Sequence, residues 1–163
     1  MNIIVTVDKN WGIGYKGKPL VSIPSDMKTF RTMTEGKVVV MGRKSVLSYP
    51  GGNLQPGRTN IVLSHDKKTK IPGAMIVTDT EELLQELKKY KSEDIYIVGG
   101  ESLYKQMLDY CDTIHVTKVD HEYSADAFFT NLDNCPEWKI TGESEELTYF
   151  DVEYSFVRYE RTI

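Results

Sequence analysis

The chain has 163 residues, of which 40% are hydrophobic and 27% are charged, and its formal net charge at pH 7 is −4. This length suits one domain with a substantial core and is short for two, so residues 1–163 are predicted to form a single domain. The acidic balance argues against a nucleic-acid partner, because phosphate backbones are bound by clustered Lys and Arg. The apolar runs are far shorter than the ~20 residues that span a bilayer, so we expect no membrane partner and a cytoplasmic location.

The cysteines and histidines show no pattern of a disulfide framework or a metal site. Cys111 and Cys135 have no CxxC spacing, and they are predicted to be buried or idle thiols. His65, His115 and His121 are too dispersed to hold a metal ion together. No metal is therefore expected.

Strands and helices alternate along the first half of the chain. Met27, Phe30 and Met33 recur at a spacing that gathers apolar side chains on one face, which predicts a helix over residues 25–33. A shorter helix is predicted over 43–47, and the segment 8–23, rich in Gly and Lys, is predicted to be a loop. Apolar, β-branched runs predict strands over 2–7, 38–41, 60–64 and 75–77.

The second half continues the alternation and then changes character. A helix is predicted over 80–90, with Thr80 as its N-cap, acids in its first turn and lysines in its last, and another over 102–109. Strands are predicted over 95–98, 113–119, 138–141 and 152–161, the last two as an antiparallel pair. The fold class is therefore α/β: a central, mostly parallel, mixed β-sheet with helices on both faces and an antiparallel hairpin at the C-terminal end.

Two strands end at glycine and lead into a helix, at residues 38–45 and 95–102. A glycine at such a junction lets a ligand approach bare backbone amides at the positive end of a helix. The two junctions together could hold a phosphorylated ligand with two ends, such as a dinucleotide. The alternative for Gly99 and Gly100 is that they simply permit a tight turn, since a lone glycine pair is a weak motif.

The carboxyl ends of the predicted strands, where α/β sheets bind ligands, should bring Thr6, residues 42–45, residues 99–104 and Thr117 to one crevice. Asp26 and Arg58 are further candidates. Asp26 follows Pro24 and shares a helix face with Phe30, so a partly desolvated carboxylate is expected there, as a proton donor or an anchor for a cationic ring. Its alternative role is as a cap or dipole partner of the helix. Arg58 could be a solvated charge at a strand entry, and Thr117 could serve β-propensity alone.

Six segments, in this order and at this spacing, resemble the dihydrofolate reductase family across essentially the whole chain: Ile13-Gly14, residues 23–26 (IPSD), 41–45 (MGRKS), 56–64 (PGRTNIVLS), 97–104 (IVGGESLY) and Thr117. The resemblance implies a dihydrofolate reductase-like domain. It also implies reduction of 7,8-dihydrofolate to 5,6,7,8-tetrahydrofolate with NADPH, which supplies one-carbon metabolism and the synthesis of thymidylate and purines. Such a protein is an antifolate target, and we expect it to act as a monomer.

The resemblance also implies the substrate site. Asp26 would accept hydrogen bonds from the amino group and N3 of the pterin, with the Thr117 hydroxyl steadying the carboxylate, and these two are the implied catalytic residues. Arg58 would bind the α-carboxylate of the glutamate tail. The other implied contacts are the backbone carbonyls of Val5 and Val98 and the pocket residues Thr6, Met27, Phe30, Tyr49, Leu54 and Tyr104.

For NADPH the resemblance implies a long series of contacts: Thr6, Ile13, Gly14, Gly42, Arg43, Lys44, Ser45, Leu63, Ser64, His65, Val98, Gly99, Gly100, Glu101, Ser102, Leu103 and Tyr104. Arg43, Lys44, Ser64 and His65 lie where the family binds the 2′-phosphate of the adenosine, which favours NADPH over NADH. The glycine-rich segment 11–22 has the composition of a mobile lid over the nicotinamide.

The chain departs from the family pattern in this lid. Pro19-Leu20-Val21 stands where the family usually has Leu-Pro-Trp. The indole N–H of that tryptophan normally helps to hold a water near the substrate, and a valine side chain cannot donate a hydrogen bond. One alternative is therefore a non-catalytic NADPH-binding module, in which the changed lid has abolished turnover. A second alternative is a related reductase of another pterin or pyrimidine ring, such as those of riboflavin biosynthesis, which would share the cofactor junctions but would not need Asp26 or Arg58 in these places.

Overall fold

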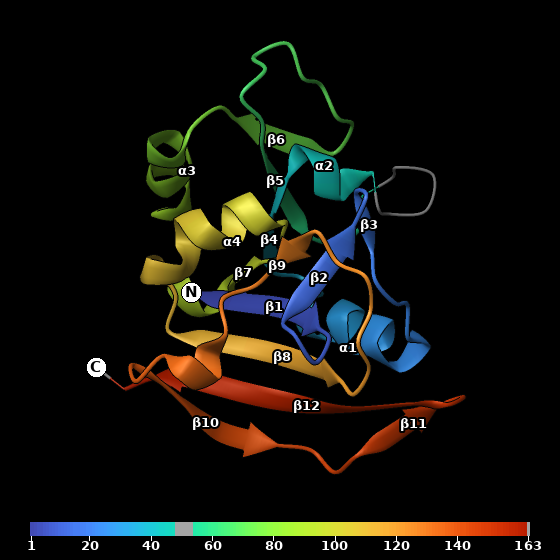
Figure 1. The fold of residues 1–163 in the computed structure, drawn as a ribbon. Helices are drawn as coiled ribbons and strands as arrows, with labels where there is room; N and C mark the ends of the chain where they lie inside the picture. The colour runs from blue at the N-terminus through green and yellow to red at the C-terminus, as the bar shows by residue number, and fades with distance from the viewer. Residues whose placement is uncertain (48–53, 163) are drawn as a thin grey trace.

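The structure is a computed structural model that describes residues 1–47 and 54–162 (Figure 1). Its α-helices are α1 (Pro24–Thr34), α2 (Arg43–Val46), α3 (Thr80–Leu87) and α4 (Glu101–Met107). The large sheet contains β1 (Asn2–Val7), β4 (Val38–Gly42), β5 (Thr59–Leu63), β6 (Ala74–Val77), β7 (Ile95–Ile97), β8 (Thr113–Val119), β10 (Trp138–Glu143), β11 (Leu147–Tyr149) and β12 (Val152–Arg161). A small sheet contains β2 (Gly12–Tyr15), β3 (Lys18–Pro19) and β9 (Ala127–Phe128).

The large sheet has the order β10-β12-β8-β1-β7-β4-β5-β6, with β11 paired to β12. Strands β1 and β4 to β8 run parallel. β12 pairs antiparallel with β8, β10 and β11, and these last strands lie together at one side of the molecule (Figure 1). The predicted mostly parallel, mixed sheet with an antiparallel C-terminal pair is confirmed.

Alternating residues of the central strands send their side chains to opposite faces of the sheet, as a period of two requires. Val38 and Val40 belong to the main core, together with buried residues of α3 and α4. Val39 and Met41 belong to a second cluster that includes Val46 of α2. The predicted placement of helices on both faces is confirmed.

The predicted N-cap of the helix that begins near residue 80 is wrong by one residue. Asp79 is the N-cap of α3, and its carboxylate accepts a hydrogen bond from the Glu82 amide at 2.8 Å. The Thr80 hydroxyl instead donates to Gln106 in α4. The helix ends at Leu87, so the lysines that were expected in its last turn follow it.

The segment predicted as a loop over residues 8–23 contains the short strands β2 and β3. β2 pairs antiparallel with β3 and with β9. Because β9 lies more than a hundred residues further along the chain, the local sequence carried no signal of this pairing. The small sheet gives residues 12–19 a defined shape beside the end of β1.

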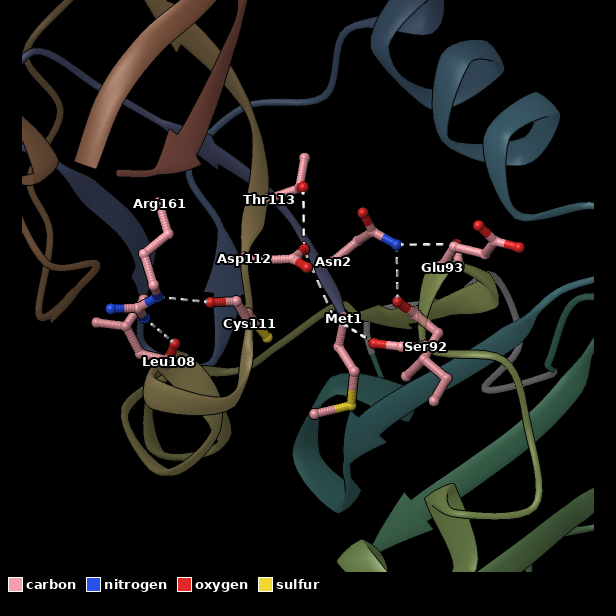
Figure 2. Close-up of polar contacts among 10 residues, drawn as sticks. Met1, Asn2, Ser92, Glu93, Leu108, Cys111, Asp112, Thr113 and Arg161 are labelled. Carbon is pink, nitrogen blue, oxygen red and sulfur yellow. Dashed lines mark hydrogen bonds and ion pairs between the residues drawn. The ribbon is translucent and has the colours of Figure 1, made fainter. Parts of the chain in front are cut away.

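Side-chain hydrogen bonds connect the segments at the amino-terminal ends of the parallel strands (Figure 2). Asn2 of β1 donates to the carbonyl oxygen of Glu93 at 3.0 Å. Arg161, near the end of the chain, donates to the carbonyl oxygens of Leu108 and Cys111 at 2.9 and 3.0 Å, which satisfies groups at the end of a helical segment. These contacts occupy the polar groups at the amino-terminal ends of the parallel strands, and the candidate site lies at their carboxyl ends.

Both cysteines are free, as the sequence predicted. Cys111 is buried, and burial raises the pKa of its thiol to about 12. The thiolate is the reactive form of cysteine, so Cys111 is an inert part of the core.

We predict that Leu83→Ala destabilises the fold by about 2–5 kcal/mol, because Leu83 is 0% exposed and its truncation leaves a cavity under α3. Urea unfolding measures the change in free energy. Leu47→Ala is the matched control, because Leu47 is 76% exposed and its truncation should cost within about 0.5 kcal/mol. Equal losses for the two variants would contradict the described core.

Candidate functional site

The central strand β1 is paired very differently on its two sides. With β8 it is in register from Asn2 to Val7, whereas with β7 only Asn2 and Ile3 are in register. Beyond Ile3 the two strands separate, and the Tyr104 hydroxyl donates to the carbonyl oxygen of Ile4 at 2.7 Å. The separation lies at the carboxyl end of parallel strands, where α/β sheets bind ligands.

The carbonyl group of Ile4 was missed by the sequence analysis, which named that of Val5. The side chain of Val5 is buried in the core, and its carbonyl group as a ligand contact stays a prediction. The pattern of apolar residues predicts where side chains point, but it does not predict which carbonyl oxygens a sheet leaves unpaired. The position where β1 and β7 separate is a tertiary feature.

Asp26 reaches from α1 to the sheet, and both oxygens of its carboxylate accept hydrogen bonds there. The hydroxyl of Thr6 donates to Oδ2 and that of Thr117 donates to Oδ1, each at 2.6 Å. The N-cap of α1 is Ile23, so Asp26 does not cap its own helix. The Thr117 side chain likewise serves more than β-propensity, since its hydroxyl holds a carboxylate.

The expected pocket walls are partly described. Phe30 is half-buried, four residues after Asp26 on α1, and Met27 is exposed at 39%. Leu54 and Val98 pack against the cluster that contains Val39 and Met41. Tyr49, also named as a pocket residue, lies outside the described residues.

Arg58 is fixed where α1 ends. Its Nε donates to the Thr34 hydroxyl at 3.1 Å, and its two terminal nitrogens donate to the carbonyl oxygens of Pro56 and Arg31. A guanidinium group has five N–H donors, so donors remain for a ligand. The side chain is half-buried and oriented, which distinguishes it from a freely solvated charge.

The two glycine junctions meet, as the sequence predicted. The Gly42 amide donates to the Gly99 carbonyl oxygen at 2.7 Å, and a Cβ atom on Gly100 would lie 3.5 Å from the Ser45 hydroxyl oxygen. Gly99 has φ +119°, a conformation that side chains rarely adopt, and the Gly99–Gly100 peptide bond is cis. A side chain at these positions would fill the cradle between the junctions.

The helices that follow the junctions are short. α2 has 4 residues and α4 has 7, so their dipoles are smaller than the sequence analysis assumed. Their N-cap residues, Gly42 and Gly100, have no side chain to cap the first amides, which leaves those amides for a ligand. The side chains of Leu63 and Leu103 are buried, so only their backbone could contact a ligand.

Three of the residues expected around a 2′-phosphate, Arg43, Ser64 and His65, already have partners near the end of β5. Arg43 forms an ion pair with Asp66 at 3.9 Å, an acid that the sequence analysis missed. The Ser64 hydroxyl lies 2.8 Å from that of Thr69, and the His65 ring contacts the Thr78 carbonyl oxygen at 3.2 Å. Lys44, which follows Arg43, is exposed, and so is Ser102 on α4. Any phosphate that bound here would compete with Asp66 for Arg43.

The expected lid over residues 11–22 lies against the end of β1. It encloses a cavity of about 30 Å³ lined by residues that include Thr6, Ile13 and Val21. Glycine suits position 14, because a Cβ atom there would lie only 3.2 Å from the Lys18 carbonyl oxygen. A cavity of this size holds about one water molecule.

Two acids connect the lid to the rest of the protein. The Asp126 carboxylate accepts a hydrogen bond from the Lys16 amide at 3.0 Å, and the Asp126 amide donates to Gly14. Glu101, the first residue of α4, accepts a hydrogen bond from the Phe128 amide of β9 at 2.7 Å. The small sheet is thereby joined to the second glycine junction.

Fold and site together define an α/β protein with a carboxylate and a backbone cradle at the carboxyl ends of its parallel strands. The family model described as "Dihydrofolate reductase" matches residues 1–161. Dihydrofolate reductases of Buchnera aphidicola and Staphylococcus haemolyticus are 33% and 32% identical, over 96% and 99% of this chain and 92% and 95% of their own lengths. A solved dihydrofolate reductase structure from Enterococcus faecalis has a TM-score of 0.87 at 23% identity and covers 99% of this chain and 96% of its own.

The chain belongs to the dihydrofolate reductase family, a family of oxidoreductases, as its motifs predicted. The structural similarity to the E. faecalis protein confirms the expected fold.

We predict that Asp126→Ala loosens the lid, because the Lys16 amide loses its acceptor. A hydrogen bond contributes about 1 kcal/mol, so release of bound NADPH, measured by stopped-flow fluorescence, should become about fivefold faster. Glu122→Ala is the control, since Glu122 is an exposed acid on the same connection between β8 and β9. An unchanged release rate in Asp126→Ala would show that this bond does not restrain the lid.

Proposed function

We propose that this chain reduces 7,8-dihydrofolate to 5,6,7,8-tetrahydrofolate with NADPH, in the crevice where β1 and β7 separate. One contact carries the assignment: the Asp26 carboxylate, held by Thr6 and Thr117 at the end of the parallel strands. Membership of the dihydrofolate reductase family supports the reaction. The E. faecalis structure of the same fold is a complex with NADP(H), which supports the cofactor.

The substrate would bind with its pterin edge on Asp26. The amino group and N3 of the pterin present two parallel N–H donors, and a carboxylate accepts such a pair in the bidentate manner of an arginine contact. Phe30, four residues further on α1, would supply the apolar wall beside the ring. The carbonyl oxygen of Val98 is a further acceptor for the pterin amine in this proposal.

Reduction adds a hydride to C6 and a proton to N5. NADPH, when bound, supplies the hydride. The negative charge of Asp26 in a half-buried site stabilises the protonated N5, and water carries the proton to it. Asp26 thus acts on the charge that develops on the pterin and does not need to reach N5 itself.

The backbone cradle fits the phosphate groups of a dinucleotide. Gly42, Gly99 and Gly100 leave room that a Cβ would fill, and the first amides of α2 and α4 have no side-chain cap. Arg43 and Lys44 would face the 2′-phosphate, with Arg43 exchanging Asp66 for the phosphate. These contacts support NADPH as the cofactor.

The glutamate tail of the substrate would end at Arg58. The contacts from Arg58 to Thr34, Pro56 and Arg31 hold the guanidinium plane in one orientation before a ligand arrives. A pre-oriented guanidinium binds a carboxylate with less loss of side-chain entropy.

All the residues that this proposal uses belong to one chain, which supports a monomer of one domain over residues 1–163. Both cysteines are free, which supports the cytoplasm as its location. Among the described residues, no helix is long and apolar enough to cross a membrane. Small molecules are the partners in this proposal, and the net charge of −4 disfavours nucleic acid.

We predict that Asp26→Asn lowers kcat for dihydrofolate by about a hundredfold or more, because the charge that stabilises the protonated N5 is lost. The loss should be larger at high pH, where N5 is harder to protonate. NADPH oxidation at 340 nm, with and without dihydrofolate, measures it. A parent protein that binds NADPH but does not oxidise it with dihydrofolate would be a non-catalytic module, and turnover only with another pterin or pyrimidine would indicate a related reductase.

We predict that Arg58→Leu weakens binding of dihydrofolate by about 2 kcal/mol, because a partly buried ion pair loses one partner. The dissociation constant of a 7,8-dihydropterin without the glutamate tail should not change. Arg31→Leu, a change on the exposed face of α1, is the control. Equal losses with both ligands would contradict a contact between Arg58 and the tail carboxylate.

A further inference from the structure

We propose that Thr6 is a positioning residue: together with Thr117, its hydroxyl fixes the plane of the Asp26 carboxylate, so that two lone pairs remain for the amidine edge of the heterocycle. The inference rests on the proposed function, because it concerns how Asp26 meets a 2-amino heterocycle. It assigns to Thr6 a hydrogen-bonding role in place of that of a passive pocket wall.

The two threonines are matched by the register of the sheet. Thr6 of β1 is the Cα partner of Thr117 of β8, so both side chains leave neighbouring strands on the same face. α1 covers that face and brings Asp26 between them. Because an ionised carboxylate is only an acceptor, both hydroxyls must donate, one to each oxygen at 2.6 Å.

The count of lone pairs shows what the clamp leaves for a ligand. An ionised carboxylate has about four lone-pair sites. Thr6 occupies one on Oδ2 and Thr117 one on Oδ1, which leaves about one on each oxygen. Two acceptor sites side by side match two parallel N–H donors, such as the amino group and ring N–H of a 2-amino pteridine or pyrimidine. With one threonine removed, the carboxylate can rotate and the match is lost.

On the side of Thr6, the side chains of lid residues 19–21 offer no hydrogen-bond donor that could replace the Thr6 hydroxyl. The small cavity beside Thr6 is lined by Pro19, Leu20 and Val21, whose side chains carry no hydrogen-bond donor. Thr6 is half-buried there, and Thr117 is 4% exposed. The Thr6 hydroxyl is the donor that the structure gives to the Oδ2 oxygen of Asp26, so we expect the orientation of that oxygen to depend on it.

The test is a double-mutant cycle between Thr6→Val and Asp26→Asn, with 2,4-diaminopteridine as the probe. Valine keeps the shape and the strand propensity of threonine and replaces its hydroxyl by a methyl group, so the midpoint of urea unfolding should not fall. Affinity and the absorbance change of the bound probe on protonation are measured for the parent, both single variants and the double variant. Thr113→Val on β8, whose hydroxyl bonds to the exposed Asp112, is the matched control.

We expect Thr6→Val to weaken binding of the probe about tenfold, as for a lost hydrogen bond to a charged group. The variant should also show less of the absorbance change that marks the protonated ring. Thr6→Ser should restore most of the affinity. In the Asp26→Asn background, Thr6→Val should have no further effect, because the hydroxyl acts through the carboxylate. If Thr6→Val fails to fold, Thr6→Ala read against Thr6→Ser makes the same comparison.

If Thr6→Val bound the probe as tightly as the parent protein does, the inference would be overturned. It would also be overturned if the double variant lost affinity by the sum of the two single losses, since the hydroxyl would then act independently of the carboxylate. Parent turnover in Asp26→Asn would instead overturn the proposed role of Asp26. The two failures are therefore distinguishable.

Discussion

The position of β1 between β7 and β8 is the constraint on which the rest of the site depends. Its ladder with β8 continues to Val7, whereas its ladder with β7 ends at Ile3. The long ladder sets Thr6 beside Thr117, and the short one leaves the Ile4 carbonyl oxygen for the Tyr104 hydroxyl. A shift of the β1–β8 pairing by one residue would turn the Thr6 hydroxyl to the opposite face of the sheet, away from Asp26.

Much of the large sheet could be predicted because its signals are local. The uninterrupted apolar runs of β4 and β7 identified strands that are covered on both faces, and the glycines after them identified where the backbone becomes accessible. The convergence of the two junctions followed from the rule that parallel strands end at one edge. Asp26 and Thr117 were paired only by resemblance to the family, since 91 residues separate them.

The features that escaped prediction depend on distant partners. β2 and β3 are short and pair with each other and with β9, so their conformation is set by tertiary contacts. Asp79 and Thr80 are both good caps by residue type; Asp79 caps the helix, whereas the Thr80 hydroxyl donates to Gln106, a partner in another helix that the local sequence does not reveal. The contact from Thr6 to Asp26 was invisible because a β-branched residue in a strand has a sufficient local reason to be there.

The hydrogen bond from the Phe128 amide to Glu101 has a mechanical consequence. Glu101 begins the helix whose first amides face the cradle, and Phe128 belongs to the strand that supports the glycine-rich cover of the crevice. Opening of that cover and unwinding of the first turn of α4 both break this hydrogen bond, so each event lowers the free-energy cost of the other. An anionic ligand that repelled the Glu101 carboxylate would transmit its arrival to the cover through this bond.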